Sequence, residues 1–151
     1  SEKEPLKFTG IPNFAPEHFR RVRLKSPLKA KQLQKGLAQL AEEGTVQLFH
    51  PLYSSEYILG AVGVLQFEVI MARLKTEYGV DAVYEGVDFA IARWVSCADP
   101  KQLETFEKTN PANLAMDSEG NLTYLDASEW RLQYVAKQWP EILFMRTRER
   151  D

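Results

Sequence analysis

The chain has 151 residues, of which 44% are hydrophobic and 26% charged, and its formal net charge is −2. This is the composition of a globular protein that can bury a core, as one domain or two small ones. No apolar run approaches the ~20 residues of a membrane span, and no signal-peptide stretch is visible. The single cysteine excludes an internal disulfide, so the sequence predicts a cytoplasmic protein.

The first half of the chain predicts the order strand, helix, strand, strand, helix, strand. Its apolar residues alternate or recur every three to four positions in segments 19–24, 26–43, 45–49, 57–62, 63–78 and 80–84. Ser26 and Pro27 form a helix-start signal, and Gly44 is the expected left-handed helix stop. In the second helix, Phe67, Ile70, Met71, Leu74 and Tyr78 form one apolar stripe, and Leu65 is expected to face the same sheet.

The second half predicts the same order again. Strands are expected at 89–95, 113–116, 122–125 and 142–145, with a compact turn at 118–120. Asp99 and Ser128 are the expected caps of two helices, which end near Lys108 and before Pro140. The tryptophans of this half are expected to build its core, namely Trp94, Trp130 and Trp139.

The fold class that follows is α+β, with two successive ferredoxin-like β-α-β-β-α-β units and antiparallel sheets. We expect the units at residues 17–87 and 88–151. Residues 1–16 are rich in proline and glycine and read as the tail of a preceding β-barrel domain plus a linker. An alternative in which both sheets pack together as one domain stays open.

The cations are concentrated in one segment. Residues 18–41 contain no acidic residue but seven basic ones, and the rest of the chain then has 12 basic against 21 acidic residues. Such asymmetry is typical of a surface that binds nucleic acid, although exposed strands and helices carry solvated cations just as often. The seven residues are Arg20, Arg21, Arg23, Lys25, Lys29, Lys31 and Lys35.

The sequence offers little catalytic chemistry. A phosphate-binding loop needs GxxxxGK[ST], and the glycines of Gly60–Gly63 lack its lysine and hydroxyl, so they are interpreted as turn and helix-entry residues. His18, His50 and Cys97 have no metal-ligand spacing, and Cys97 is interpreted as a small packed side chain. We therefore expect no catalytic, cofactor-binding or metal site in this chain.

Four segments carry a resemblance to a known family: NFAPEHFRRV, KGLAQLAEEGTVQLF, GAVGVLQFEVIMARLKTEYGVDAVYE and ARWV. Together they resemble the C-terminal domain of bacterial class II peptide chain release factor three, a translational GTPase related to elongation factor G. The third domain of elongation factor G shares the glycine turn and the helix that follows, but not EEGTVQLF. The resemblance covers nearly the whole chain, and after Leu103 it is one of general layout.

The resemblance implies a non-catalytic fragment of a larger protein. The family's full-length members bind GTP and GDP in an N-terminal domain, carry a β-barrel second domain, and help to remove class I release factors from the ribosome after the peptide is freed. The C-terminal domain is implied to contact the small ribosomal subunit and to transmit nucleotide state. No membrane partner is expected.

A ribosome-facing surface must neutralise phosphates, which makes the seven cations of residues 18–41 the candidate contact. Arg146 and Arg148, with Arg150, are a second candidate. Two other functions stay open: a free-standing RNA-binding module, which needs aromatic rings exposed on a sheet face, and a small acid-base enzyme, which needs converging carboxylates in a cleft.

Overall fold

The computed structural model describes residues 12–149, and its first half is a ferredoxin-like unit. The four strands have the order β5-β2-β4-β3 and all their pairings are antiparallel. A short 3-10 turn, Pro27–Lys29, precedes α1. The elements are β2 (His18–Leu24), α1 (Ala30–Glu42), β3 (Gln47–Pro51), β4 (Tyr57–Ala61), α2 (Leu65–Tyr78) and β5 (Ala82–Glu85).

The second half repeats this arrangement. Its strands have the order β7-β8-β6-β9, which is the order of the first unit read from the other side, and they too are antiparallel. The elements are β6 (Ile91–Ser96), α3 (Pro100–Thr109), β7 (Leu114–Asp117), β8 (Leu122–Asp126), α4 (Glu129–Gln138) and β9 (Leu143–Met145). The prediction of two successive ferredoxin-like units is confirmed.

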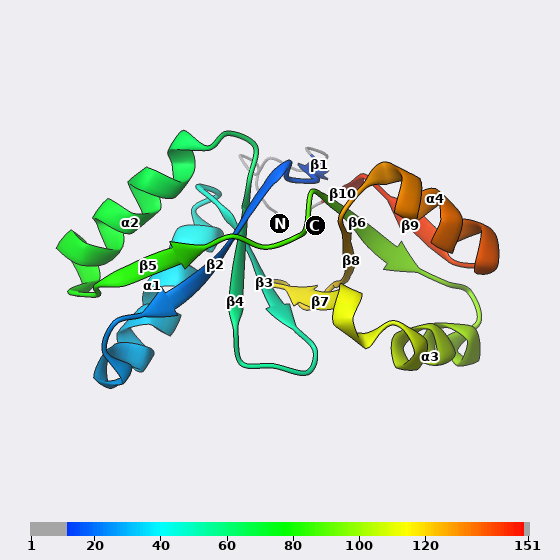
Figure 1. Ribbon diagram of the computed structural model, residues 1–151, viewed down its shortest axis with the longest axis horizontal. Helices are drawn as coiled ribbons and strands as arrows, with labels where there is room; N and C mark the ends of the chain where they lie inside the picture. Colours follow the sequence, from blue (N-terminus) through cyan, green and yellow to red (C-terminus); the bar gives the residue numbers. More distant parts are fainter. Residues whose placement is uncertain (1–11, 150–151) are drawn as a thin grey trace, which may run out of the picture.

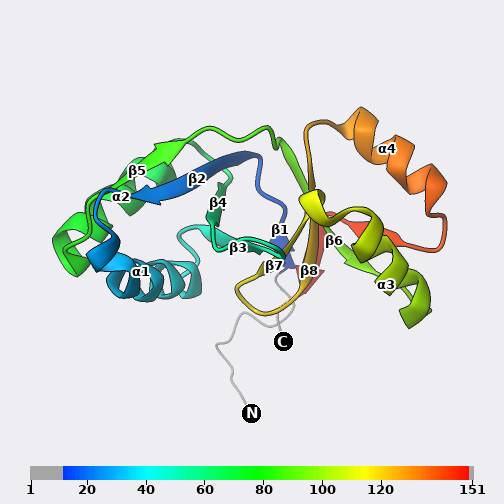
Figure 2. The same cartoon turned by 60° about the horizontal axis from the view of Figure 1, so that its bottom comes forward.

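The two units are joined through their inner strands. β3 pairs antiparallel with β7, with Phe49 opposite Asp117 and Pro51 opposite Ala115, so all eight strands form one sheet. Figures 1 and 2 show α1 and α2 at one end of the molecule, α3 and α4 at the other, and the strands between them. A separate two-stranded sheet pairs β1 (Pro12–Phe14) with β10 (Thr147–Glu149).

The predicted tail at 1–16 lies mostly outside the described residues.

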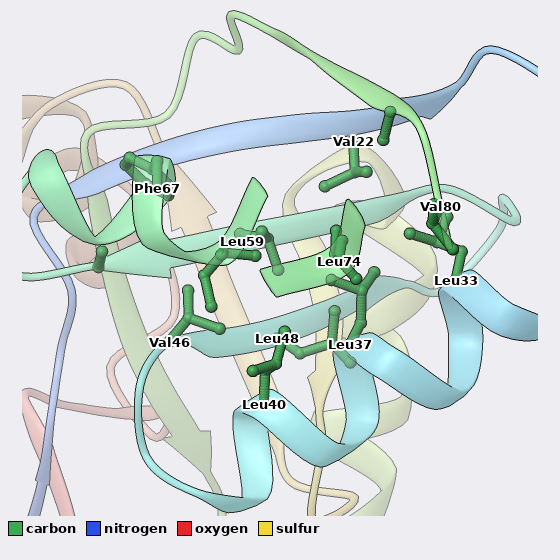
Figure 3. Close-up of a cluster of buried hydrophobic side chains, with 13 residues drawn as sticks. Val22, Leu33, Leu37, Leu40, Val46, Leu48, Leu59, Phe67, Leu74 and Val80 are labelled. Atoms are coloured by element: carbon green, nitrogen blue, oxygen red, sulfur yellow. The ribbon is translucent and has the colours of Figure 1, made fainter. Parts of the chain in front are cut away.

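Each unit has a hydrophobic core between its helices and its part of the sheet. In the first, leucines of α1 and the inward stripe of α2 meet the side chains of β2, β3 and β4, as Figure 3 shows. The second is built around Phe106, Tyr124 and Leu132, with Trp139 and Phe144 packed against it. Cys97 is half-buried against this second core, in agreement with its interpretation as a packed side chain.

A third core lies on the sheet face that the helices do not cover. In β3, Leu48 belongs to the first core and its neighbour Phe49 to the third. In β4, Leu59 belongs to the first core and its neighbour Ile58 to the third. Because successive side chains of a strand point to opposite faces, both faces of the sheet are buried here. Residues of both units meet in this core: Phe19, Phe49, Ile58, Ala92, Ala115 and Leu125.

Two predicted core residues are exposed instead. Leu65, at the first position of α2, is 69% exposed, whereas Phe67, Ile70 and Leu74 are buried as expected. Trp130 is 74% exposed, because the buried face of α4 is formed by Leu132 and Val135. At 100° per residue, Trp130 lies roughly 160° round the helix from Leu132, so it points into solvent. It stacks there on Tyr134.

The local start and stop signals are largely confirmed. Asp99 and Ser128 accept hydrogen bonds from the backbone N–H groups of Lys101 and Arg131, whereas Ser26 stands at its helix start without a side-chain cap. Gly44 has a φ of 86°, as the predicted stop requires. The assignment of Gly60 is corrected: it lies within β4, where an added Cβ would stand 2.6 Å from the Pro16 ring.

Candidate functional site

The three arginines of β2 point to both faces of the sheet. Arg20 lies on the helix-covered face, where its guanidinium carbon stands 4.8 Å from the centre of the Phe67 ring. Its Nη1 donates a hydrogen bond to the carbonyl oxygen of Phe19 at 2.8 Å. A guanidinium over an aromatic face is held by the ring's quadrupole and by packing of its own stem. Arg20 is therefore part of the fold as well as a surface cation.

Arg21 and Arg23 point to the opposite face and meet carboxylates. Arg21 Nε lies 3.2 Å from Glu56 and its Nη1 lies 3.7 Å from Glu85, while Arg23 Nη1 donates to Glu85 at 2.9 Å. Glu85 belongs to the neighbouring strand β5, and Glu56 precedes β4. These two acidic residues offset much of the positive charge that the sequence places on β2.

The lysines are the available part of the basic segment. Lys25, Lys31 and Lys35 are exposed, and Lys29 is half-buried in the 3-10 turn. Among the side chains that the structure describes, none of these lysines forms an ion pair. Lys31 and Lys35 are four residues apart on α1, on the side away from the buried leucines. Within residues 12–149, the predicted cluster is thus divided into arginines that meet carboxylates or an aromatic ring and lysines that form no ion pair.

In the second candidate, near the C-terminus, the structure describes one side chain, that of Arg146. Arg146 is exposed, and its Nη2 stands 3.7 Å from Glu129, which also accepts a 2.6 Å hydrogen bond from Arg93 Nη2. The backbone of Arg148 lies in β10, opposite Asn13, and its side chain is not described. Arg150 lies outside the described residues. Glu129 therefore holds Arg146 close to a second, buried arginine.

Arg93 is a residue that sequence reasoning missed. It is only 6% exposed, and its Nη1 donates to the carbonyl oxygen of Ala92 at 2.8 Å. Burial lowers the pKa of this guanidinium, Glu129 opposes that effect, and the nearby charge of Arg146 adds to it. No sequence signal distinguishes Arg93 from an ordinary outward arginine of an alternating strand.

Among the described side chains, the sheet offers no open aromatic platform of the kind that the RNA-binding alternative requires. Phe19 and Phe49 lie on the face without helices, but both are buried in the third core, with ring centres 6.3 Å apart. Trp94 is buried as well, and its indole N–H donates to Asp117. An RNA base could not stack on these rings without separating the two units.

A cleft lined by carboxylates exists, but one of them, Asp117, is hydrogen-bonded to the backbone. The cavity of about 430 Å³ between the end of α1 and the β7–β8 turn is lined in part by Glu42, Asp117 and Glu119. Asp117 accepts hydrogen bonds from the backbone N–H groups of Glu119 and Asn121 and from Trp94. These hydrogen bonds show that Asp117 stabilises the turn between β7 and β8.

The described residues hold no arrangement typical of a metal or membrane site. No three histidine, cysteine, aspartate or glutamate side chains within residues 12–149 are grouped so that they could hold a metal ion. In the same range, no helix is both long and apolar enough to span a bilayer.

His50 packs edge-on against Tyr57, and burial lowers the pKa of its imidazole.

Comparison with known protein families supplies the identity. A family model described as class II release factor RF3, C-terminal domain, matches residues 8–136. The match spans the first unit and the second as far as α4, so it covers the basic segment and the junction between β3 and β7. The chain belongs to the class II release factor RF3 family, as its C-terminal domain.

Proposed function

We propose that this chain is the ribosome-contacting domain of a translation termination GTPase, which promotes the GTP-dependent release of class I release factors. The family match carries this proposal, because it identifies the chain as a release factor domain. The parent protein is then a GTPase that binds GTP and GDP elsewhere in its chain. The domain itself is non-catalytic, acts in the cytoplasm, and adjoins the GTPase and β-barrel domains of its own polypeptide.

The proposed contact to the small subunit is the basic segment, with its lysines outermost. Lys25, Lys31 and Lys35 present charge that no described carboxylate offsets. Cations of this kind bind phosphates by position and without reading bases, as a rigid factor on ribosomal RNA requires. Arg20, Arg21 and Arg23 stay in the proposal as cations that hold β2 in place and add to the local potential, together with Lys29. Arg146 and Arg148 are proposed as a second, smaller contact.

Charge reversal on α1 in the full-length parent tests the proposal. We expect Lys31→Glu with Lys35→Glu to weaken ribosome binding and to reduce its salt dependence, since each lost phosphate contact lowers the salt slope by about one unit. Pelleting with ribosomes over a range of salt concentrations measures both effects. The fold should persist, because exposed charges contribute little to stability.

The matched control reverses two exposed lysines of the second unit, Lys101→Glu with Lys137→Glu, and changes the net charge by the same amount. Equal weakening by both pairs would mean that net charge alone is responsible. Unchanged binding and an unchanged slope for the α1 pair would show that these lysines are only a solvated surface.

A further inference from the structure

The helix α2 is apolar on two opposite sides. Its inner side packs Phe67 and Leu74 into the first core, as Figure 3 shows. At roughly 100° per residue, Leu65, Val69 and Ala72 lie within about 60° of one another on the side opposite to Leu74. All three are exposed, Leu65 to 69% and Val69 to 48%. Helices that are apolar all round are normally buried all round, whereas the described residues cover only the inner side of α2.

The apolar surface continues into the connection between β4 and α2. Val62 is 58% exposed there, and Val64 is 47% exposed. We call this surface the outer apolar face, and it consists of Val62, Val64, Leu65, Val69 and Ala72. Single exposed apolar side chains are ordinary, but several that gather in one patch mark a surface that binds a partner.

The chemistry of the outer apolar face fits a protein and not RNA. None of its five residues is charged or aromatic. The nearest arginine of the helix, Arg73, is held by Glu43 at 2.7 Å and by Glu77 at 2.8 Å, and Glu68 is exposed at the border of the face. RNA needs cations for its phosphates and rings for its bases, and this face supplies neither. Its partner is therefore a protein that presents an apolar surface.

The outer apolar face lies beside the segment through which the chain enters the first unit. The N–H group of Glu17 donates to the carbonyl oxygen of Ala61 at 3.1 Å. The next residue, Val62, lines a cavity of about 460 Å³ together with Ala15 and Glu17. The entry is held in place, because β1 pairs with β10 and the N–H group of Ala15 donates to the carbonyl oxygen of Arg146 at 2.9 Å. Whatever precedes β1 in the parent polypeptide is thus tethered close to Val62.

We propose that the outer apolar face is the docking surface for the domain that directly precedes this chain in its parent, the β-barrel domain of the proposed function. The inference rests on that proposed function for the presence of the domain, and it adds where the domain binds. A short tether gives a roughly millimolar effective concentration, so that even a small apolar contact stays formed. The lysines of α1 are not part of this face, so docking and ribosome contact use different residues.

Thiol labelling tests the proposal in the isolated chain and in the full-length parent with GDP. Ala72→Cys changes the face least, and the reaction of the peptide that carries it with iodoacetamide is followed by mass spectrometry. We expect this thiol to react about tenfold more slowly in the parent, as for a face that is uncovered about a tenth of the time. The matched control, Lys101→Cys at an exposed position of α3, should react equally fast in both proteins.

A second variant locates the docking. Val69→Glu places a charge within the face, and in the parent it should return the labelling rate of Ala72→Cys to that of the isolated chain. Ala127→Glu, at an exposed position between β8 and α4, adds the same charge elsewhere and should leave the protection unchanged. Circular dichroism of the isolated chain confirms that each variant is folded.

Equal labelling of Ala72→Cys in the chain and in the parent would overturn the proposal, and so would protection that survives Val69→Glu or that extends to Lys101→Cys. Photo-cross-linking from p-benzoylphenylalanine at position 65 of the parent identifies the occupant. Cross-links to the preceding domain of the same molecule support the proposal, whereas cross-links only to another domain or to a second copy contradict it. Ribosomes are absent from these experiments, so their failure leaves the test of the α1 lysines unaffected.

Discussion

Single side chains show why an apolar pattern alone does not decide burial. Phe67 and Leu65 are two residues apart at the start of α2, yet only Phe67 reaches the core. The Phe67 ring packs edge-on against Tyr84 at 5.6 Å and also lies under the guanidinium of Arg20. The Tyr84 hydroxyl donates to the carbonyl oxygen of Phe67 at 2.6 Å, and burial raises the pKa of that phenol. Phe67 thus connects α2 to two strands.

Replacement of Phe67 by alanine should lower the free energy of unfolding by about 3–5 kcal/mol, because it removes a buried ring and leaves a cavity. Urea denaturation of the purified chain measures this loss. Leu65→Ala is the matched control at an exposed position and should stay within about 0.5 kcal/mol of the wild type. Similar losses for both variants would show that the outward side of α2 is covered in solution.

At the scale of the elements, helix starts are specified by different means. α4 begins with a serine whose hydroxyl accepts from a backbone N–H group, while the helix after Ser26 begins with a proline and no such bond. α2 uses a third arrangement, in which Gln66 accepts from the N–H groups of Val62 and Gly63 and donates to the Thr45 carbonyl. A side chain of the first helical turn can thus fix the backbone that leads into a helix, even where the N-cap residue makes no side-chain hydrogen bond.

Ser128→Ala should therefore destabilise the protein by about 1 kcal/mol, the typical value of a lost serine cap. Ser26→Ala should cost only a few tenths, because no side-chain hydrogen bond is removed and Pro27 still presets the backbone. Thermal melts of the two variants side by side distinguish them. A larger loss for Ser26→Ala than for Ser128→Ala would contradict the assigned cap geometry.

At the scale of the whole molecule, the continuous sheet and the third core connect the two units. Phe49 is fully buried and stands opposite Asp117 of the other unit across the β3–β7 pairing. Separation of the units would expose this ring together with Phe19 and Ile58, and would leave β3 and β7 as open edges. The shared burial favours a single cooperative transition over two independent ones.

Two probes report on different parts of the molecule and test this cooperativity. Tryptophan fluorescence reports on the second unit, which contains Trp94, Trp130 and Trp139. Far-ultraviolet circular dichroism reports mainly on the first unit, because its helices α1 and α2 have 13 and 14 residues, whereas α3 and α4 of the second unit have 10 each. We expect urea midpoints from tryptophan fluorescence and far-ultraviolet circular dichroism to coincide. Phe49→Ala should lower both together, by about 3–5 kcal/mol in stability. Separate midpoints would mean that the units unfold independently.

Much of this architecture was predictable from local patterns. Alternation in the strands, the spacing of Phe67, Ile70 and Leu74, and the signals at Asp99, Ser128 and Gly44 act within a few residues, so they survive without tertiary information. The structure confirms those elements to within a few residues. The segments that resemble a release factor domain are likewise a property of the sequence, and the family match agrees with them.

The sequence by itself determined the types and order of the elements within the two ferredoxin-like units, the family, and the presence of seven cations in residues 18–41. Only the tertiary structure decided which of these cations meet a carboxylate. Arg23, for example, pairs with Glu85, which lies 62 residues further along the chain. The tertiary structure also decided that β3 pairs with β7, that Trp130 faces solvent, and that a cleft forms between the units. Such features depend on which distant segments become neighbours, and no local periodicity encodes that choice.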